Sequence, residues 1–194
     1  MNILKENYFE NEEFNNIVQS NTDLKLKNFS ECIFEGCDFT GSDFSETLFS
    51  ECKFQNTNLS LVLITNSKLQ NIYFENCKIL GIDFTAINKL IVELEFHDCI
   101  LNECNFSMLE LKETDFINCQ IKNSDFYQTN LTGSNFSNSD LQDTIFENTN
   151  LSKVNFKEAK NYYINPLVNN LKKATFSMPE AIVLLESLGI VIDY

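Results

Sequence analysis

The feature that most constrains this chain is a five-residue period that runs through most of it. From Cys32 the sequence divides into CIFEG, CDFTG, SDFSE, TLFSE and CKFQN, and from Ser124 into SDFYQ, TNLTG, SNFSN and SDLQD. The third residue of each unit is Phe or Leu, and the first is small or β-branched. Of the 18 phenylalanines in the chain, 17 occupy this central third position. One repeating structural unit is therefore predicted for most of the chain.

A period of five fits neither the 3.6-residue α-helix nor an unbroken β-strand. Within a unit, however, the first and third residues lie two apart, so extended backbone points both to the same side. Each unit is thus expected to be a very short strand followed by a corner. A chain that turns regularly in this way closes into coils that stack at about 4.8 Å. Phe recurs every ten residues from Phe96 to Phe156, which indicates an even number of faces per coil, either two or four.

This pattern resembles the pentapeptide-repeat family over residues 24–156. Members of that family form four-sided, right-handed β-helices with about 20 residues per coil, and the resemblance implies the same geometry here. The predicted fold class is therefore an all-β solenoid, a right-handed quadrilateral β-helix, with a short C-terminal α-helix.

The predicted β-helix spans residues 24–160, and residues 1–23, which fit the repeat poorly, are expected to cap its first open edge. Between Phe84 and Phe96 the register slips by two residues. This slip predicts a bulge or kink near residues 85–95 that divides the helix into two segments. The outward positions nearby are unusually apolar, and we expect them to pack against the N-terminal segment, the alternative being contact with a partner. They are Leu61, Leu63, Tyr73 and Leu80.

The C-terminal extension, residues 161–194, is predicted to form a helix and a dimer contact. Ser177-Met178-Pro179-Glu180 has the pattern of a capping box with proline in the first turn, which predicts a helix of about ten residues ending at Gly189 and then a short strand over 190–192. The apolar residues cover more than the stripe that a surface helix needs, so one face can close the last coil and another can bind a second copy of the chain. The extension is also similar to the segment that makes the dimer in quinolone-resistance (Qnr-type) members of the family. The predicted dimer interface is Phe176, Met178, Ile182, Leu185, Leu188, Ile190 and Ile192.

The seven cysteines all lie two residues before a central residue, at the small inward position. They are Cys32, Cys37, Cys52, Cys77, Cys99, Cys104 and Cys119. Because cysteine behaves as a small, often buried hydrophobe, they are predicted to belong to the core. Pairs such as Cys99 and Cys119 would stack one coil apart, but no histidine occupies an inward position, and no metal site is predicted.

Composition narrows the functional classes. The chain has 28 acidic and 14 basic residues, a net charge of −14, which disfavours binding to nucleic acid and favours a basic protein partner.

The N-terminus has charges where a signal peptide needs an apolar run, and the apolar stretches are too short to span a bilayer, so a cytoplasmic protein with no membrane contact is expected. The only histidine, His97, lacks a positioned nucleophile, and there is no phosphate-binding glycine loop. No catalytic residues, no cofactor and no enzymatic activity are predicted.

The distribution of charge suggests a function. Residues 29–160 hold 20 acidic and 9 basic residues, a net charge of −11. On a rod roughly 32 Å long, this is a little over half of the about 19 charges on B-DNA of that length. The chain resembles Qnr-type proteins in its repeat, its acidity and its C-terminal extension. Some Qnr-type proteins have long loops that project from the coils, whereas this chain has only the two-residue slip. Those proteins are understood to engage the DNA-binding saddle of DNA gyrase and topoisomerase IV and to protect these enzymes from quinolones.

The resemblance therefore implies a DNA mimic that binds gyrase or topoisomerase IV through outward acidic residues. A general interaction scaffold with another partner, and an immunity protein against a gyrase-targeting toxin, are the alternatives. The candidate contacts are Asp38, Asp43, Glu46, Glu51, Asp83, Asp115, Asp125 and Asp140.

Overall fold

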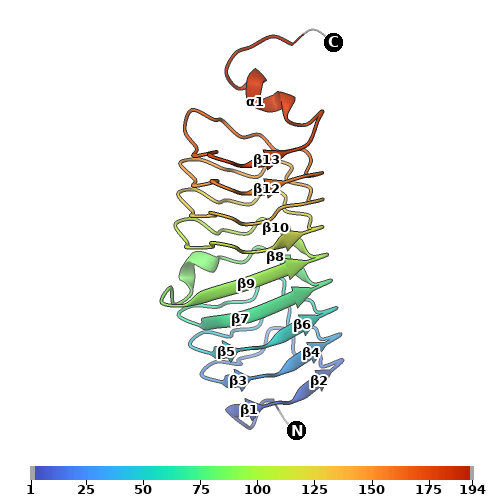
Figure 1. Cartoon of the computed structure of the whole chain (residues 1–194). Helices are drawn as coiled ribbons and strands as arrows, with labels where there is room; N and C mark the ends of the chain where they lie inside the picture. The colour runs from blue at the N-terminus through green and yellow to red at the C-terminus, as the bar shows by residue number, and fades with distance from the viewer. Residues whose placement is uncertain (1–2, 193–194) are drawn as a thin grey trace.

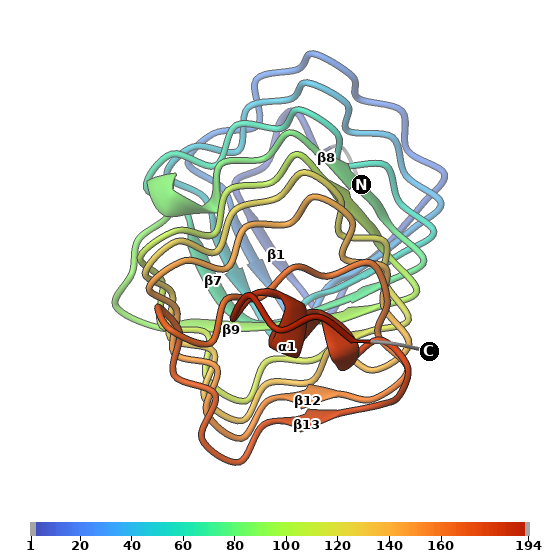
Figure 2. The ribbon, with the colours of Figure 1, turned by 90° about the horizontal axis from the view of Figure 1, so that it is seen from above.

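The computed structural model describes residues 3–192, which form a stack of about eight coils (Figure 1). Strands pair in parallel with the strands of the neighbouring coils, and the usual spacing between partners is 20 residues: Phe9 lies beside Phe29, and Phe29 beside Phe49. Four five-residue units therefore complete one coil, which settles the choice between two and four faces. The view along the axis shows the four-sided outline (Figure 2). The predicted right-handed quadrilateral β-helix is confirmed.

The main sheet covers two adjacent faces of the N-terminal half. One face contains β1 (Tyr8–Glu10), β3 (Asn28–Ser30) and β5 (Leu48–Ser50), and the next contains β2 (Glu13–Asn15), β4 (Ile33–Glu35) and β6 (Lys53–Gln55). The longer strand β7 (Lys68–Glu75) pairs with both β5 and β6, and β9 (Val92–His97) follows it. The other strands are β8 (Lys78–Leu80), β10 (Ile100–Asn102), β11 (Phe116–Ile117), β12 (Asn155–Phe156) and β13 (Thr175–Phe176). Single-residue bridges join most of the remaining units.

The central residues of the units fill the interior as stacks of rings. Phe9 lies 4.9 Å from Phe29, and Phe106 lies 4.8 Å from Phe126, with nearly parallel planes. Rings on neighbouring faces meet edge to face, as Phe116 and Phe126 do at 5.6 Å and 90°. Both arrangements are favourable for aromatic pairs. A five-residue period with Phe at its centre thus produces a continuous aromatic core.

The inward first positions form a second set of buried contacts. The Ser124 hydroxyl accepts a hydrogen bond from the Cys104 backbone N–H at 3.1 Å and donates to the Leu101 carbonyl at 2.7 Å, so it satisfies two groups of the coil below. All seven cysteines are buried and unpaired, which confirms their assignment to the core. Burial raises the pKa of the Cys104 thiol to about 12. This thiol therefore stays protonated at neutral pH, a state that suits neither metal binding nor nucleophilic attack.

The corners have left-handed backbone at the fifth position of the unit. Gly36 occupies such a corner with φ +63, but most corners are occupied by residues with a side chain, such as Asn16 (φ 53), Glu51 (φ 54) and Met108 (φ 58). Asparagine is frequent at these corners because it tolerates the left-handed region better than other side chains.

The first coil begins earlier than the sequence predicts. β1 pairs with β3 and β2 with β4 in the usual 20-residue register, and Phe9 and Phe14 are buried between them. Residues 8–23 are thus part of the β-helix, whereas the whole of residues 1–23 was expected to be a separate cap.

This start of the repeat is hidden in the sequence because the first positions of its units hold Asn7 and Glu12, which are not small residues. At the end of a stack these positions need not be fully buried. The inward position of the next coil holds Lys27, which is buried and donates from Nζ to the Glu6 carbonyl oxygen at 2.8 Å. This bond ties the N-terminal segment to the second coil.

The two-residue slip is absorbed without dividing the stack. Phe74 pairs with Phe96 across 22 residues, and the register between β7 and β9 shifts between Leu69 and Ile72 on β7. The extra residues lie near the short 3-10 helix η1 (Phe84–Ala86), while β7 and β9 stay hydrogen-bonded (Figure 1). The expected division into two segments is therefore wrong. So is the expected packing of the apolar patch on the N-terminal segment, because Leu61 and Leu63 are exposed.

The C-terminal end also differs from the prediction. The repeat continues to β13, which pairs with β12 in the 20-residue register. The helix α1 (Ile182–Glu186) has five residues in place of about ten, because the Ser177 hydroxyl bonds to Glu158 and does not cap the helix. Gly189 ends the following turn with φ +76, and the expected strand over 190–192 is irregular backbone. Viewed along the axis, α1 lies across the end of the last coil (Figure 2).

Candidate interaction surface

The second residue of each unit points outward and is often Asp or Asn. Its side-chain oxygen accepts a hydrogen bond from the backbone N–H two residues later, from Thr40 to Asp38 at 2.9 Å and from Tyr127 to Asp125 at 2.7 Å. The hydrogen bonds from the Thr40 hydroxyl and N–H lower the pKa of Asp38. Asn58 makes the same turn without a charge. These side chains therefore stabilise the corners. Asp and Asn alternate at this position in the sequence, which indicates this structural role because both can accept the same hydrogen bond.

The predicted acidic contacts are spread over several faces of the β-helix, because residues one coil apart stack into columns. Asp83 and Asp125 lie in one column, which also contains Asp43 nearer the N-terminus. Asp38 and Asp140 share a second column, in which Lys78 and Lys160 also stand, and Asp115 belongs to a third. Glu46 and Glu51 occupy corners. The structure thus does not gather the eight residues on one face.

Two of these carboxylates are already paired with lysines. Asp43 Oδ2 lies 3.1 Å from Lys25 Nζ, and Asp140 Oδ2 lies 3.1 Å from Lys122 Nζ. Burial raises the pKa of Asp43, but hydrogen bonds from Ser45 and from the lysine outweigh it and leave the pKa below its ordinary value. Because a lysine lies beside each of them, these two carboxylates add little to the net negative charge of the surface.

The corner glutamates are better placed to meet a partner. Glu31 and Glu51 occupy the same corner in successive coils, since the N–H of Glu31 donates to the Ser50 carbonyl, and both have left-handed backbone that projects the side chain outward. Glu46 stands at the corner that precedes Glu51 in the chain. Of these three, Glu31 was not among the predicted contacts, although its spacing of 20 from Glu51 would have identified it once four faces were known.

Charge is also distributed unevenly along the axis. Residues 3–51 hold 11 acidic residues and 3 lysines, whereas residues 150–173 hold 1 acidic residue and 5 lysines. Because the coils are stacked in chain order, this difference in sequence becomes a difference between the two ends of the molecule (Figure 1). The N-terminal end is strongly acidic, and the last coils are basic.

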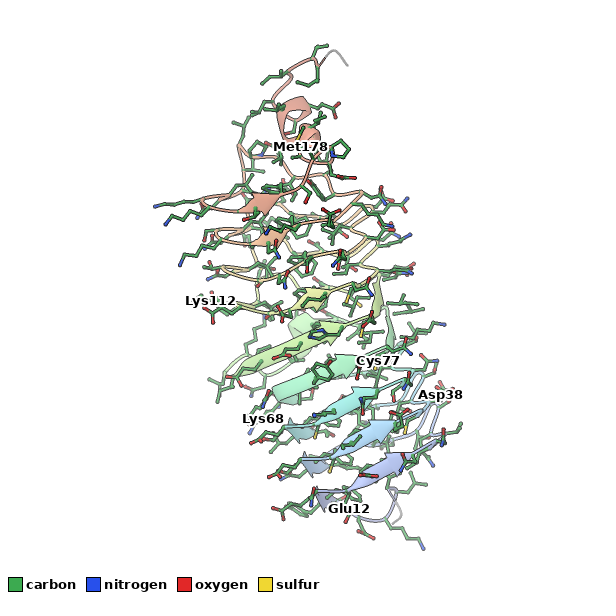
Figure 3. The ribbon with its side chains drawn as sticks, turned by 45° about the vertical axis from the view of Figure 1, so that its right-hand side comes forward. Glu12, Asp38, Lys68, Cys77, Lys112 and Met178 are labelled. Atoms are coloured by element: carbon green, nitrogen blue, oxygen red, sulfur yellow. The ribbon has the colours of Figure 1, made fainter. Side chains whose placement is uncertain are left out.

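The predicted dimer residues lie in two environments. Phe176 is stacked on Phe156 at 5.1 Å and is half-buried, so it extends the aromatic core. Ile182 and Ile192 are also partly buried. The others are exposed on α1 and its flanks, and Met178 projects beyond the last coil (Figure 3). They are Met178, Leu185, Leu188 and Ile190. No helix within residues 3–192 has the length and apolar character needed to cross a membrane.

A separate group of side chains meets where β9 and β11 are paired. The ligand-type atoms of Glu95, His97 and Asp115 all lie within 4.8 Å of one another. Asp115 was predicted as a surface charge and no role was predicted for His97, so the two residues were not expected to belong to one site. The signal is the spacing: Glu95 and His97 flank Phe96 on the outer side, and Asp115 follows Glu95 by one coil.

Comparisons with known proteins agree with the architecture. The family model described as pentapeptide repeat region matches residues 27–90 and 87–156. No curated protein matches the sequence. The fold is similar to that of a trypsin-treated variant of QnrB1, a plasmid-mediated fluoroquinolone resistance protein, with a TM-score of 0.65 and 20% identity over 96% of this chain and 92% of that one. For full-length QnrB1 the TM-score is 0.58, with 17% identity over 92% and 100% of the two chains.

Proposed function

Because the chain belongs to the pentapeptide-repeat family, we propose that it is a non-catalytic DNA mimic that binds DNA gyrase or topoisomerase IV and protects it from quinolones. The observation behind this proposal is the acidic N-terminal half of a continuous four-sided rod. At about 4.8 Å per coil the stack is on the order of 40 Å long, which is comparable to about one turn of B-DNA.

The acidic end supplies the part that resembles DNA. Glu31 and Glu51 stand in successive coils at one corner, so their carboxylates repeat along the axis as phosphates do along a strand. A basic surface that binds DNA attracts such a row of charges through the same long-range electrostatics. The lysine-rich residues 150–173 lie at the far end, where they do not oppose this contact.

The environment of the thiols and carboxylates supports the proposed non-catalytic role. The seven thiols are buried in the core, and most carboxylates at second positions are occupied in the turns that hold the corners. Fold similarity to QnrB1 at 17–20% identity supports the architecture and does not by itself assign a partner.

The test is a gyrase supercoiling assay in the presence of ciprofloxacin, titrated with the purified full chain. We expect supercoiling to recover at low-micromolar protein. The variant Glu31→Lys with Glu51→Lys should reduce this protection at least about tenfold, because two repulsive contacts replace two attractive ones.

The matched control places the same charge change at another corner, Glu103→Lys with Asp143→Lys, and should protect nearly as well as wild type. If the protein inhibits gyrase and supercoiling does not recover, binding to gyrase would be supported and protection from quinolones would be rejected. Absence of any effect on both gyrase and topoisomerase IV would reject the proposal.

A general interaction scaffold is the second candidate, and exposed leucines favour it. Leu26, Leu61 and Leu63 are more than half exposed on the N-terminal half of the molecule. Apolar groups at such positions are typical of contact surfaces. If this candidate is right, Leu61→Asp with Leu63→Asp will abolish partner binding while the acidic corner variant leaves it unchanged.

A further inference from the structure

The coil that contains the two extra residues presents an unusual group of side chains on its outer face. In β9, Glu95 and His97 lie on either side of the buried Phe96, so both point outward. β11 pairs with β9 through Phe116 and Phe96, which places Asp115 beside Glu95 in the next coil. His97 is the only histidine in the chain.

The three side chains are arranged as in a binding site that lacks its ligand. The ligand atoms of Glu95, His97 and Asp115 lie within 4.8 Å of one another. His97 Nε2 is 3.7 Å from Glu95 Oε2, which is too long for a hydrogen bond, and this nitrogen is buried and has no hydrogen-bond partner among the described residues. A buried polar atom that makes no bond needs an explanation.

The imidazole ring is held in place from below. Tyr73, on β7, packs against it with ring centroids 5.0 Å apart. The His97 side chain is 23% exposed and the Glu95 side chain 52% exposed, so the group opens to water on one side. A fixed nitrogen beside a movable carboxylate allows an ion to enter and retain a water ligand.

The surroundings of the group are electronegative. Within residues 3–192 no lysine forms an ion pair with Glu95 or Asp115. The two carboxylates therefore face each other and the imidazole without a compensating cation.

We propose that Glu95, His97 and Asp115 form a binding site for a divalent transition-metal ion, with Zn²⁺ as the expected occupant. One imidazole nitrogen and two carboxylate oxygens form a donor set that suits Zn²⁺, and water fills the fourth position of a tetrahedron. Ligands bonded at about 2.0–2.2 Å stand roughly 3–3.5 Å apart. Rotation of the exposed Glu95 side chain and a small movement of Asp115 are enough to reach this spacing.

The site would have a structural consequence. The ion joins β9, where the register shifts, to β11 in the regular coils above. Metal binding of this kind adds stability only when the ligands are folded together. The proposal is independent of the proposed function, since it concerns a different part of the surface from Glu31 and Glu51.

The test uses tag-free full-length protein, freed of metal and titrated with ZnCl₂ or CoCl₂. Calorimetry should give one ion per chain. Because there is one histidine, its ring resonances in an NMR spectrum report directly on the site and should shift on binding. The Co²⁺ spectrum should lack sulfur-to-metal charge transfer, which distinguishes this site from the buried cysteines. The melting temperature should rise with Zn²⁺.

His97→Gln should abolish binding and Asp115→Asn should weaken it at least about tenfold, whereas both should leave the melting temperature of the metal-free protein nearly unchanged. Asp23→Asn, the same change at the same position of a repeat unit several coils away, is the matched control and should bind Zn²⁺ as wild type does. Unchanged Zn²⁺ binding by His97→Gln, or no binding of either ion by wild type at millimolar concentration, would overturn the proposal.

Discussion

At the scale of single residues, the inside of this protein could be predicted from the sequence and the outside could not. The period of five identifies 17 of the 18 phenylalanines and every buried Cys, because inward positions must be apolar or small; it missed Phe176, which stacks on Phe156. Outward residues follow no such rule. Asp38 and Asp125 were assigned to a partner, although their side chains hold the adjacent corners. Glu95 and Asp115 are neighbours only because one coil contains four units, a number that the period alone left open and that the family resemblance supplied.

The left-handed corners allow a direct test at this scale. Met108 is an exposed corner residue with φ 58, a conformation that costs a residue with a side chain about 1 kcal/mol or more relative to glycine. Met108→Gly should therefore stabilise the protein by about 0.5–1 kcal/mol after the entropy of glycine in the unfolded chain is counted. Met108→Ala keeps the Cβ and should change stability by less than half as much. Chemical denaturation measures both, and equal effects would refute the explanation.

At the scale of elements, stability comes from links between successive coils. Asp140 connects three of them, since it accepts hydrogen bonds from Lys122 in the coil below and from Asn161 in the coil above, at 3.1 and 2.7 Å. Burial raises the pKa of Asp140, but these two partners outweigh it and hold the pKa below its ordinary value of 3.8.

The sign of the pH dependence follows from this direction. A carboxyl group with a lowered pKa in the folded state adds stability above about pH 4, and this stability is lost as the pH falls through the folded-state pKa. Asp140→Asn should therefore lower the free energy of unfolding by about 0.5–1 kcal/mol at pH 7, and the difference from wild type should shrink below about pH 4 and disappear below the lowered folded-state pKa. Denaturant melts at several pH values measure it.

A double-mutant cycle provides the control for Asp140. If the ion pair is the cause, Lys122→Gln should cost a similar amount and the double variant little more than either single change. A loss of stability in Asp140→Asn that does not shrink as the pH falls below about 4 would point to packing and contradict the electrostatic account.

The errors made for whole elements have physical causes. The C-terminal helix was predicted from a capping box, but in the structure the Ser177 hydroxyl bonds to Glu158 of the preceding coil. A tertiary contact thus replaces a local one, and a local pattern cannot reveal it. The first coil was missed because Asn7 and Glu12 occupy its small positions, which only the open end of a stack tolerates.

At the scale of the whole molecule, the exposed apolar residues around α1 predict a dimer. Leu185 and Leu188 are 42% and 43% exposed, so replacing both with Asp should disturb the monomer little while placing charges in a contact between copies. Light scattering should show a dimer for wild type and a monomer for this variant, with an unchanged circular dichroism spectrum.

The control for the dimer uses leucines elsewhere on the surface. Leu61 and Leu63 are 60% and 54% exposed, and changing both to Asp adds the same charge far from α1. This variant should remain dimeric. A monomeric wild type, or an unchanged mass after the α1 substitutions, would refute the predicted interface.

The position of α1 has a consequence for polymerisation. Every coil offers its neighbour the same row of backbone donors and acceptors, and so does the outermost coil at each end. The acidic first coil of one molecule and the lysine-rich last coil of another would attract each other in the register that the β-helix already uses. α1 lies across the end of that last coil (Figure 2), where it would stand in the way of a second molecule. A five-residue helix at one end would thus favour a particle of fixed length over a growing fibre.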